Sequence, residues 1–183
     1  MIQLFRGLNG YCIGSTGKTP HALDVSSGVL PPCGLYRTVL PIGEVAAGRL
    51  VYFHNHGDPG PGLYFPERWT ANRAHFSPRG TTLPVMFDPK ALVALPAEGF
   101  YRVTAAFYCC EKRCLRFEPE ALVQLGYNGA GRGLLFAPEL AGGAITVPER
   151  GTPINDAALS HLVALRIAER REDIALPRGI VVH

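Results

Sequence analysis

Residues 48–69 read GRLVYFHNHGDPGPGLYFPERW. Two apolar runs, 50–53 and 63–65, flank a segment of asparagine, glycine, aspartate and proline, the residue types that favour turns. Short runs rich in aromatic and branched residues, bounded by such turn formers, are typical of β-strands in hairpins. The stretch therefore predicts a strand, a tight turn and a return strand.

The same pattern recurs along the chain after residue 34. Short apolar runs alternate with turn residues in LYRTVLPIG (35–43), NRAHF (72–76), TTLPVMF (81–87), GFYRVTAAFYCC (99–110), GLLFAPEL (133–140) and GAITVPERG (143–151). Tyr101 and Val103 alternate with Arg102 and Thr104, so one face of that strand is expected to be buried. Residues 109–114, CCEKRC, predict the tip of a further hairpin, with CLRF (114–117) as its return strand.

One segment near the C-terminus has the spacing of a helix. In residues 155–171, Asn155 or Asp156 is suited to cap the first turn, and arginines gather near the last turn. The apolar residues with nearly helical spacing are Leu159, Leu162, Val163 and Ile167. We therefore expect a mainly β fold with antiparallel strands, barrel- or sandwich-like, with short strands, tight turns and one C-terminal helix at about 155–171.

The chain is expected to consist of a loop-rich N-terminal arm, 1–34, and a β-rich domain, 35–183. Two internal similarities occur within the domain. FDPKALVAL (87–95) matches FEPEALVQL (117–125), 30 positions later, and glycine, leucine, phenylalanine and Arg-Gly-Thr residues of 60–81 recur 71 positions later in 131–152. One interpretation is two related β subdomains, 35–95 and 100–154, followed by the helix; the other is chance likeness between glycine-rich hairpins.

The composition and charge of the chain argue against several classes of protein. The net charge is +3 and the 18 lysines and arginines are scattered, so no nucleic-acid partner is expected. No apolar run reaches the ~18 residues of a membrane span, and the N-terminal residues lack a targeting pattern. The five cysteines are an odd number, which favours reduced thiols. These features predict a cytoplasmic protein with no membrane partner.

His54 and His56 are the sharpest candidates for chemistry. Side chains alternate along a strand, so two residues spaced in this way point to the same face. Two imidazoles on one face of a sheet are typical ligands of zinc or iron. Gly48 to His56 resembles the G-x5-H-x-H opening of the cupin metal motif, and His-x-His before glycine and proline resembles the segment of JAMM-type metal hydrolases.

The chain departs from both families beyond the histidines. The hydrolase motif has a serine where Tyr64 stands and an aspartate where Glu67 stands, and the cupin motif has a glutamate slightly further from His56 than Asp58. The favoured interpretation is therefore a polar turn that holds no metal. In the alternative, zinc is bound by His54 and His56 with a third ligand from His75, Glu67 or Asp58.

The cysteines and aromatic residues offer two further candidates. Cys109, Cys110 and Cys114 lack the paired C-x2-C spacing of structural zinc sites, and adjacent strand residues such as Cys109 and Cys110 are expected to point to opposite faces. Cys110 and Cys114 flank the hairpin tip and are a candidate redox-sensitive pair. The residues expected to form an exposed interaction surface are Trp69, Tyr64, Arg68 and Arg73.

No complete catalytic arrangement is apparent in the sequence. We therefore expect a non-enzymatic cytosolic module that binds other protein subunits, as an adaptor or structural subunit of a larger, bacterial-type assembly, with no cofactor. The alternative is a metal-dependent hydrolase that uses the His54/His56 pair and zinc. A third interpretation is a small-molecule-binding β-barrel.

Overall fold

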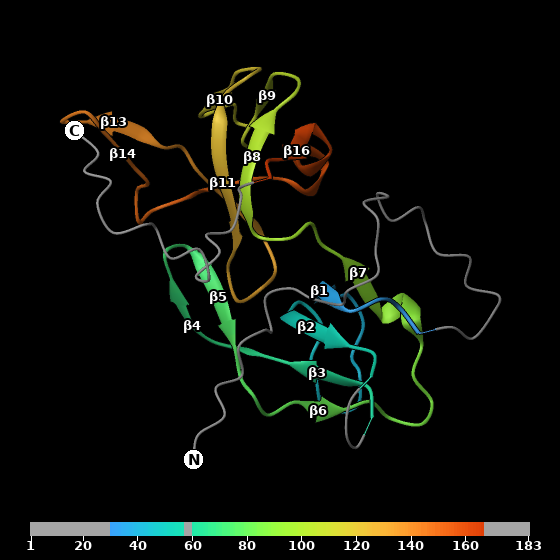
Figure 1. Cartoon of the computed structure of the whole chain (residues 1–183). Coiled ribbons are helices and arrows are strands. Elements are labelled where there is room, and N and C mark those ends of the chain that lie inside the picture. Colours follow the sequence, from blue (N-terminus) through green and yellow to red (C-terminus); the bar gives the residue numbers. More distant parts are fainter. Residues whose placement is uncertain (1–29, 57–59, 167–183) are drawn as a thin grey trace, which may run out of the picture.

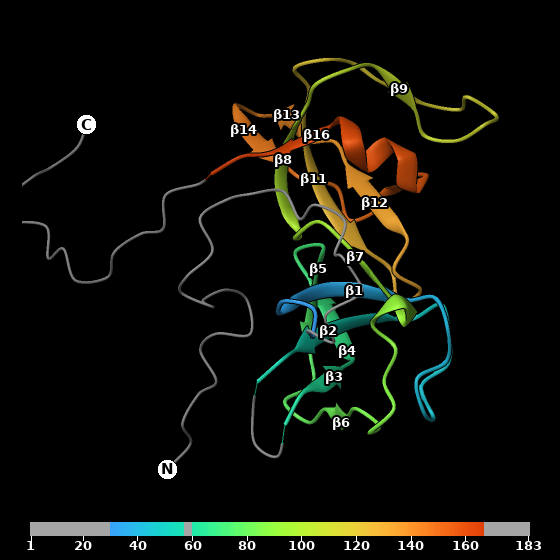
Figure 2. The same ribbon diagram turned by 90° about the vertical axis from the view of Figure 1, so that its right-hand side faces the viewer.

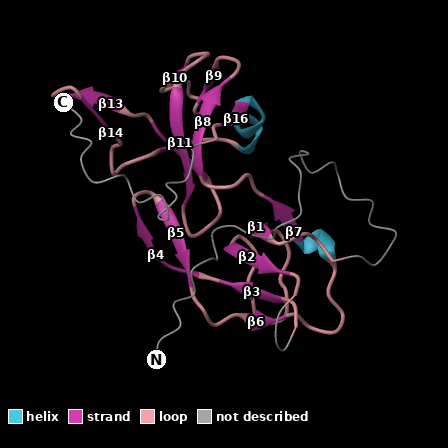
Figure 3. Cartoon of the chain, in the orientation of Figure 1, coloured by secondary structure: helices cyan, strands magenta, loops and turns pink. Residues whose placement is uncertain are grey.

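The computed structural model describes residues 30–56 and 60–166. Over this range the chain is mainly β-structure in antiparallel sheets, as predicted, with little helix (Figure 1, Figure 3). The N-terminal arm expected at 1–34 lies almost wholly outside the described residues.

Two five-stranded antiparallel sheets form the body of the molecule. The first contains, from one edge to the other, β6 (Thr81–Thr82), β3 (Gly62–Tyr64), β2 (Leu50–His54), β1 (Gly34–Thr38) and β7 (Leu92–Ala94). The second contains β15 (Thr152–Pro153), β12 (Gly133–Phe136), β11 (Leu122–Tyr127), β8 (Gly99–Val103) and β16 (Leu162–Ala164). Figure 1 and Figure 2 show the first sheet in the lower half of the molecule and the second sheet in the upper half.

The two sheets follow the same plan along the chain. In each, the first two long strands pair in the centre, a third strand joins them, a separate two-stranded hairpin follows, and a short strand and a 3-10 turn precede the last strand. The separate hairpins are β4 (Pro66–Thr70) with β5 (Arg73–Phe76), and β13 (Glu139–Ala141) with β14 (Ala144–Thr146). The similarity between the two sheets extends to individual hydrogen bonds. Tyr36 Oη donates to Pro32 O at 2.8 Å, and Tyr101 Oη donates to Ala97 O at 2.6 Å.

The β4–β5 hairpin leaves the first sheet and packs on the second (Figure 1). Asn72 Nδ2 at the hairpin tip donates to Gln124 Oε1 at 3.1 Å, and Gln124 Nε2 donates back to Ala71 O at 2.8 Å. Ala74 is fully buried within the core cluster of the second sheet. These contacts tie the two halves of the chain together.

Each sheet has its own cluster of buried apolar side chains. The cluster of the first sheet includes Val51, Phe53 and Leu63, and that of the second includes Val103, Val123 and Leu125. The half-buried face expected for 99–103 is present, since Tyr101 and Val103 are buried. The cysteine hairpin is also present as β9 (Phe107–Tyr108) paired with β10 (Arg116–Phe117).

The barrel form of the expected architecture and the C-terminal helix are wrong. Neither sheet closes into a barrel within the described residues, because β6 and β7 remain the edges of one sheet and β15 and β16 the edges of the other. The helix predicted at 155–171 is absent over its described part, where a 3-10 turn, η3 (Asp156–His161), leads directly into β16. Pairing of Leu162 with Val103 extends the sheet and prevents the helix from continuing. Residues 167–171 lie outside the described range.

The helical elements among the described residues are two short 3-10 turns. η2 (Pro89–Ala91) has Pro89 in its first turn, and Asp88 Oδ1 accepts from Lys90 N at 2.9 Å. In the similar segment 117–125, residues 118–121 form a single hydrogen-bonded turn before β11, in which Ala121 N donates to Glu118 O at 3.3 Å. Neither η2 nor η3 is long or apolar enough to cross a bilayer, and no other described segment is a spanning helix.

Candidate metal centre

His54 and His56 lie side by side at the end of β2. His54 is the last residue of the strand, and Asn55 and His56 follow in a bend, so His54 is not part of the turn. The ring centroids are 4.2 Å apart, with an angle of 49° between the ring planes. The two imidazoles therefore face a common space.

Cys33, the residue immediately before β1, completes this cluster. β1 pairs with β2 so that Gly34 is opposite Phe53, and continuing that antiparallel register by one residue brings Cys33 opposite His54. The Cys33 sulfur lies 3.2 Å from His54 Nδ1 and 3.6 Å from His56 Nδ1. Cys33, His54 and His56 can each present one ligand atom such that all three atoms are within 4.8 Å of one another.

Hydrogen bonds to a proline pair hold Cys33 in place. Pro31 and Pro32 restrict the backbone immediately before it. Asn55 Nδ2 donates to Pro31 O at 3.1 Å, and Tyr36 Oη donates to Pro32 O. Burial raises the pKa of Tyr36 to about 12, with smaller effects of Cys33 and Tyr52, so its phenol remains a donor at neutral pH.

The surroundings suit a thiolate and neutral imidazoles. The backbone amide of Asn55 donates to the Cys33 sulfur at 3.3 Å, and amide donors stabilise the charged form of a thiol. Burial lowers the pKa of His54, and the neighbouring His56 lowers it further, so His54 is uncharged at neutral pH. A deprotonated cysteine and a neutral histidine are the forms that bind metals.

The two sulfur–nitrogen separations are close to those around one tetrahedral ion. With zinc–sulfur and zinc–nitrogen bonds of about 2.3 and 2.0–2.1 Å, tetrahedral geometry places sulfur and nitrogen ligands about 3.6 Å apart. The two sulfur–nitrogen separations here are 3.2 and 3.6 Å. The Asn55 Oδ1 atom also lies in the cluster, accepting from the Cys33 sulfur at 3.0 Å and lying 2.7 Å from His56 Nδ1. Metal binding would replace these two contacts of Asn55.

The third ligands considered from sequence do not belong to this cluster. His75 lies in β5 and Glu67 in β4, and neither is a member of the donor group formed by Cys33, His54 and His56. Asp58 lies outside the described residues. Sequence reasoning missed Cys33 because it precedes His54 by 21 positions, and strand register alone brings the two together.

The second sheet has a position equivalent to this site, and the β4–β5 hairpin covers it. β8 pairs with β11 so that Gly99 is opposite Leu125, which makes Glu98 and Gly126 the equivalents of Cys33 and His54. The Tyr127 amide donates to Glu98 Oε1 at 3.3 Å, just as the Asn55 amide donates to Cys33. The β4–β5 hairpin lies over this position, since the Ala74 amide donates to Glu98 Oε2 at 2.9 Å.

The covering hairpin explains the glycine at 126. A Cβ atom on Gly126 would lie 2.3 Å from the backbone oxygen of Asn72 at the hairpin tip. In the first sheet the equivalent position carries the His54 side chain, which points at Cys33 and His56. The same place in the two sheets is therefore packed against a hairpin in one and lined by metal-type ligands in the other.

The residues expected to form an interaction surface have other contacts. Trp69 Nε1 donates to Tyr127 O at 2.7 Å, which fixes the indole against the second sheet although the residue is 44 % exposed. Arg73 Nη2 donates to Glu98 O at 3.2 Å, also across to the second half. Arg68 Nη1 donates to Thr70 Oγ1 at 2.9 Å. Tyr64 lies in β3, with its ring 6.3 Å from that of His54.

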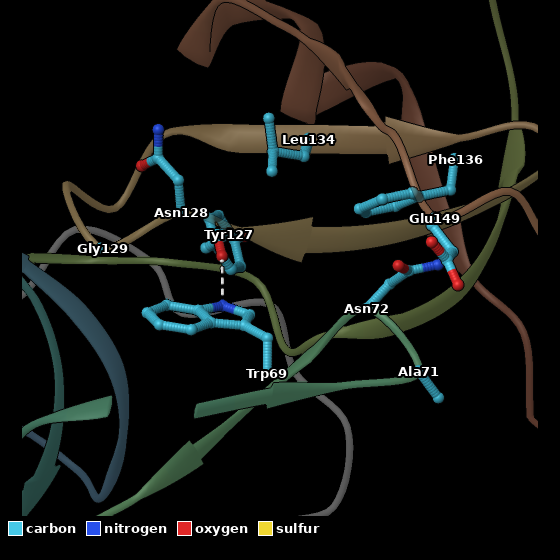
Figure 4. A pocket seen from close by; sticks show the side chains of 9 residues that line it. All are labelled: Trp69, Ala71, Asn72, Tyr127, Asn128, Gly129, Leu134, Phe136 and Glu149. Atoms are coloured by element: carbon cyan, nitrogen blue, oxygen red, sulfur yellow. Dashed lines mark hydrogen bonds between the residues drawn. The ribbon is translucent and has the colours of Figure 1, made fainter. Parts of the chain in front are cut away.

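Trp69 also forms one wall of a cavity of about 480 Å³ between the hairpin and the second sheet. In Figure 4 its indole lies beneath β11, with Asn72 and Glu149 at the other end of the cavity. The lining residues are Trp69, Ala71, Asn72, Tyr127, Asn128, Gly129, Leu134, Phe136 and Glu149. A cavity of this size, with aromatic walls and a few polar groups, is typical of small-molecule sites.

Comparisons with known protein families, with characterised proteins and with solved structures give no significant match to this chain.

Proposed function

We propose that this protein is a zinc-dependent enzyme of the hydrolase type, with Cys33, His54 and His56 as the protein ligands. The observation that supports it is the meeting of one thiol and two imidazoles at neighbouring ends of β1 and β2, with sulfur–nitrogen separations close to those around one tetrahedral ion. Thiolate and imidazole together favour zinc over magnesium or calcium, which prefer oxygen ligands.

Among residues 30–56 and 60–166, three donors form this group, and that number supports a catalytic rather than a structural role. Structural zinc sites use four protein ligands, whereas catalytic sites use three and leave one position for water or substrate. Zinc bound in this way lowers the pKa of its water to about 7 and supplies a nucleophile for hydrolysis. Asn55 serves as a positioning residue, because its backbone amide contacts the Cys33 sulfur and its side chain holds Pro31.

Cys33→Ser should abolish tight zinc binding at this centre. Loss of groups that merely orient a ligand costs about 10- to 100-fold in metal affinity, so loss of the thiolate ligand should cost at least ~100-fold. The measurement is a zinc titration of the chelator-treated full chain by calorimetry. Both proteins compared carry Cys114→Ser, so that the cysteines near residue 110 contribute little to the signal.

His54→Ala should give the same loss, while His75→Ala serves as the matched control, because His75 is outside the donor group. Hydrolysis of model carboxylic and phosphoric esters should require zinc and disappear in Cys33→Ser. Equal zinc affinity with and without Cys33, or ester hydrolysis that survives chelation, would rule out the proposal.

A second function, binding of other protein subunits, is supported by the β13–β14 hairpin. Leu140 and Ile145 are paired across the hairpin and are 78 % and 67 % exposed. The corresponding hairpin of the first half, β4–β5, packs on the second sheet, whereas all residues of β13 and β14 are exposed within the described chain. Exposed apolar pairs of this kind are candidate contacts for a partner.

A photoreactive side chain at position 145 should cross-link the protein to one partner of defined mass in its host. Leu140→Ser should remove that product without lowering the melting temperature, because the exposed side chain contributes little burial. A photoreactive group at Met86, which is 91 % exposed in another loop, is the matched control. Identical products from positions 86 and 145 would argue against a specific surface on the hairpin.

A further inference from the structure

The second half of the chain carries a hairpin with three cysteines that are not part of the proposed zinc centre. Residues 109–115 form the loop between β9 and β10, within the connection from β8 to β11. Cys109 is buried, Cys110 is partly buried and Cys114 is exposed, so the three sulfurs extend from the core toward the surface. They belong to a different sheet from Cys33.

The three sulfurs lie within 4.8 Å of one another, and Cys110 Sγ is in contact with both of the others. Cys109 Sγ is 3.6 Å from Cys110 Sγ, and Cys110 Sγ is 3.7 Å from Cys114 Sγ. The expectation that Cys109 and Cys110 point apart is wrong, because β9 ends at Tyr108 and both cysteines lie in the bend that follows. Three sulfurs bound to one tetrahedral ion at about 2.3 Å would be about 3.8 Å apart, close to these values.

A backbone amide of the loop is directed at one of the three sulfurs. The amide of Leu115 donates to Cys109 Sγ at 3.3 Å. Amide donors to sulfur stabilise thiolates, the form in which cysteine binds metals.

We propose that Cys109, Cys110 and Cys114 form a second metal site, distinct from the zinc centre and selective for a thiophilic cation such as Zn²⁺ or Cd²⁺. Thiolate ligands select soft ions and disfavour magnesium, calcium and manganese. An ion bound here links the buried Cys109 to the exposed Cys114 and so fixes the loop against the core. Binding to the folded state alone also stabilises the fold.

The test uses cadmium as the probe and the full chain with Cys12→Ser and Cys33→Ser. Of the five cysteines, this background keeps the three of the loop and removes the thiol of the zinc centre. In a reductant that does not bind metals, added Cd²⁺ should produce a thiolate-to-metal absorption band in the ultraviolet that saturates at one equivalent. The melting temperature should rise with Cd²⁺.

Adding Cys114→Ser should lower the absorbance per cadmium by about one third and weaken binding at least ~10-fold. Cys114 is exposed, so this variant is expected to fold, and unfolding curves check that it does. Glu111→Gln keeps all three sulfurs and is the matched control. An absent band, or a band unchanged by both Cys110→Ser and Cys114→Ser, would overturn the second site. Neither result bears on the zinc centre, because Cys33 is absent throughout.

Discussion

Gly126→Ala should lower the free energy of unfolding by about 3 kcal/mol, at the upper end for an extra methyl group in a packed site. The new Cβ would lie 2.3 Å from the backbone oxygen of Asn72, and backbone atoms cannot rotate away as a side chain can. Hydrogen bonds from Asn72 Nδ2 to Gln124 and to Pro148 O, at 3.1 and 3.0 Å, resist withdrawal of the hairpin tip. Urea unfolding followed by the fluorescence of Trp69, the single tryptophan, measures the loss.

Gly129→Ala is the matched control for this substitution. A Cβ on Gly129 would lie 3.8 Å from the nearest atom of Trp69, an ordinary contact, so the change should stay within about 0.5 kcal/mol. Equal stability of the two variants would show that the β4–β5 hairpin does not press on β11. The hairpin would then no longer explain why position 126 is glycine while position 54 carries a histidine.

The strands of this fold could be predicted because each is a local pattern. The runs at 50–53, 63–65 and 99–103 show their apolar or alternating character within a few residues, and turn formers mark their ends. β4–β5 and β9–β10 are both hairpins, and in each the residues that pair are close in sequence. Local information is sufficient for elements of this kind.

The predicted helix at 155–171 was wrong because the apolar pattern of this segment fits two structures. Leu159, Leu162 and Val163 have helical spacing, but Leu162 and Val163 also pair with β8 as an edge strand. Residues 162–165 read LVAL, the same letters as residues 92–95 after η2. In both halves these letters follow a short 3-10 turn and begin the last strand of the sheet, since η2 leads into β7 and η3 leads into β16.

The sequence indicated two of the three ligands of the candidate metal centre. The spacing of His54 and His56 placed both on one face, but Cys33 joins them through pairing of β1 with β2, which no local pattern specifies. The register could not be derived from the histidines alone. The residues after His56 offer His75 and Glu67 as third ligands, whereas the donor that completes the cluster, Cys33, lies upstream.

Glu98→Ala should lower the free energy of unfolding by about 3 kcal/mol at neutral pH. The Glu98 carboxylate accepts from the amides of Ala74 and Tyr127, and both of those residues are buried. An amide left without a partner in the interior costs about 1–3 kcal/mol, and here two amides lose theirs. Because one amide comes from each half of the chain, Glu98 is a link between the β4–β5 hairpin and β11. Chemical unfolding curves of the two proteins give the difference.

Glu118→Ala is the matched control, since the side chain of Glu118 is 59 % exposed and its ion pair with Arg116 lies at the surface. It should change stability by less than about 0.5 kcal/mol. Glu98→Gln keeps one acceptor oxygen and should fall between the two. A loss for Glu98→Ala no larger than for Glu118→Ala would contradict the link.

The pH dependence gives an independent check on Glu98. Burial raises the pKa of its carboxyl above the usual value near 4.5, against the opposing effects of the Ala74 and Tyr127 amides and of Arg73. The folded protein therefore binds this proton more tightly than the unfolded chain does. The stabilisation that comes from tighter binding of this proton is complete below pH ~4.5. It is lost as the pH rises through the folded-state pKa of Glu98. The stability difference between the native protein and Glu98→Ala should accordingly shrink as the pH rises through this range; a difference that grows would mean that the amide donors outweigh burial.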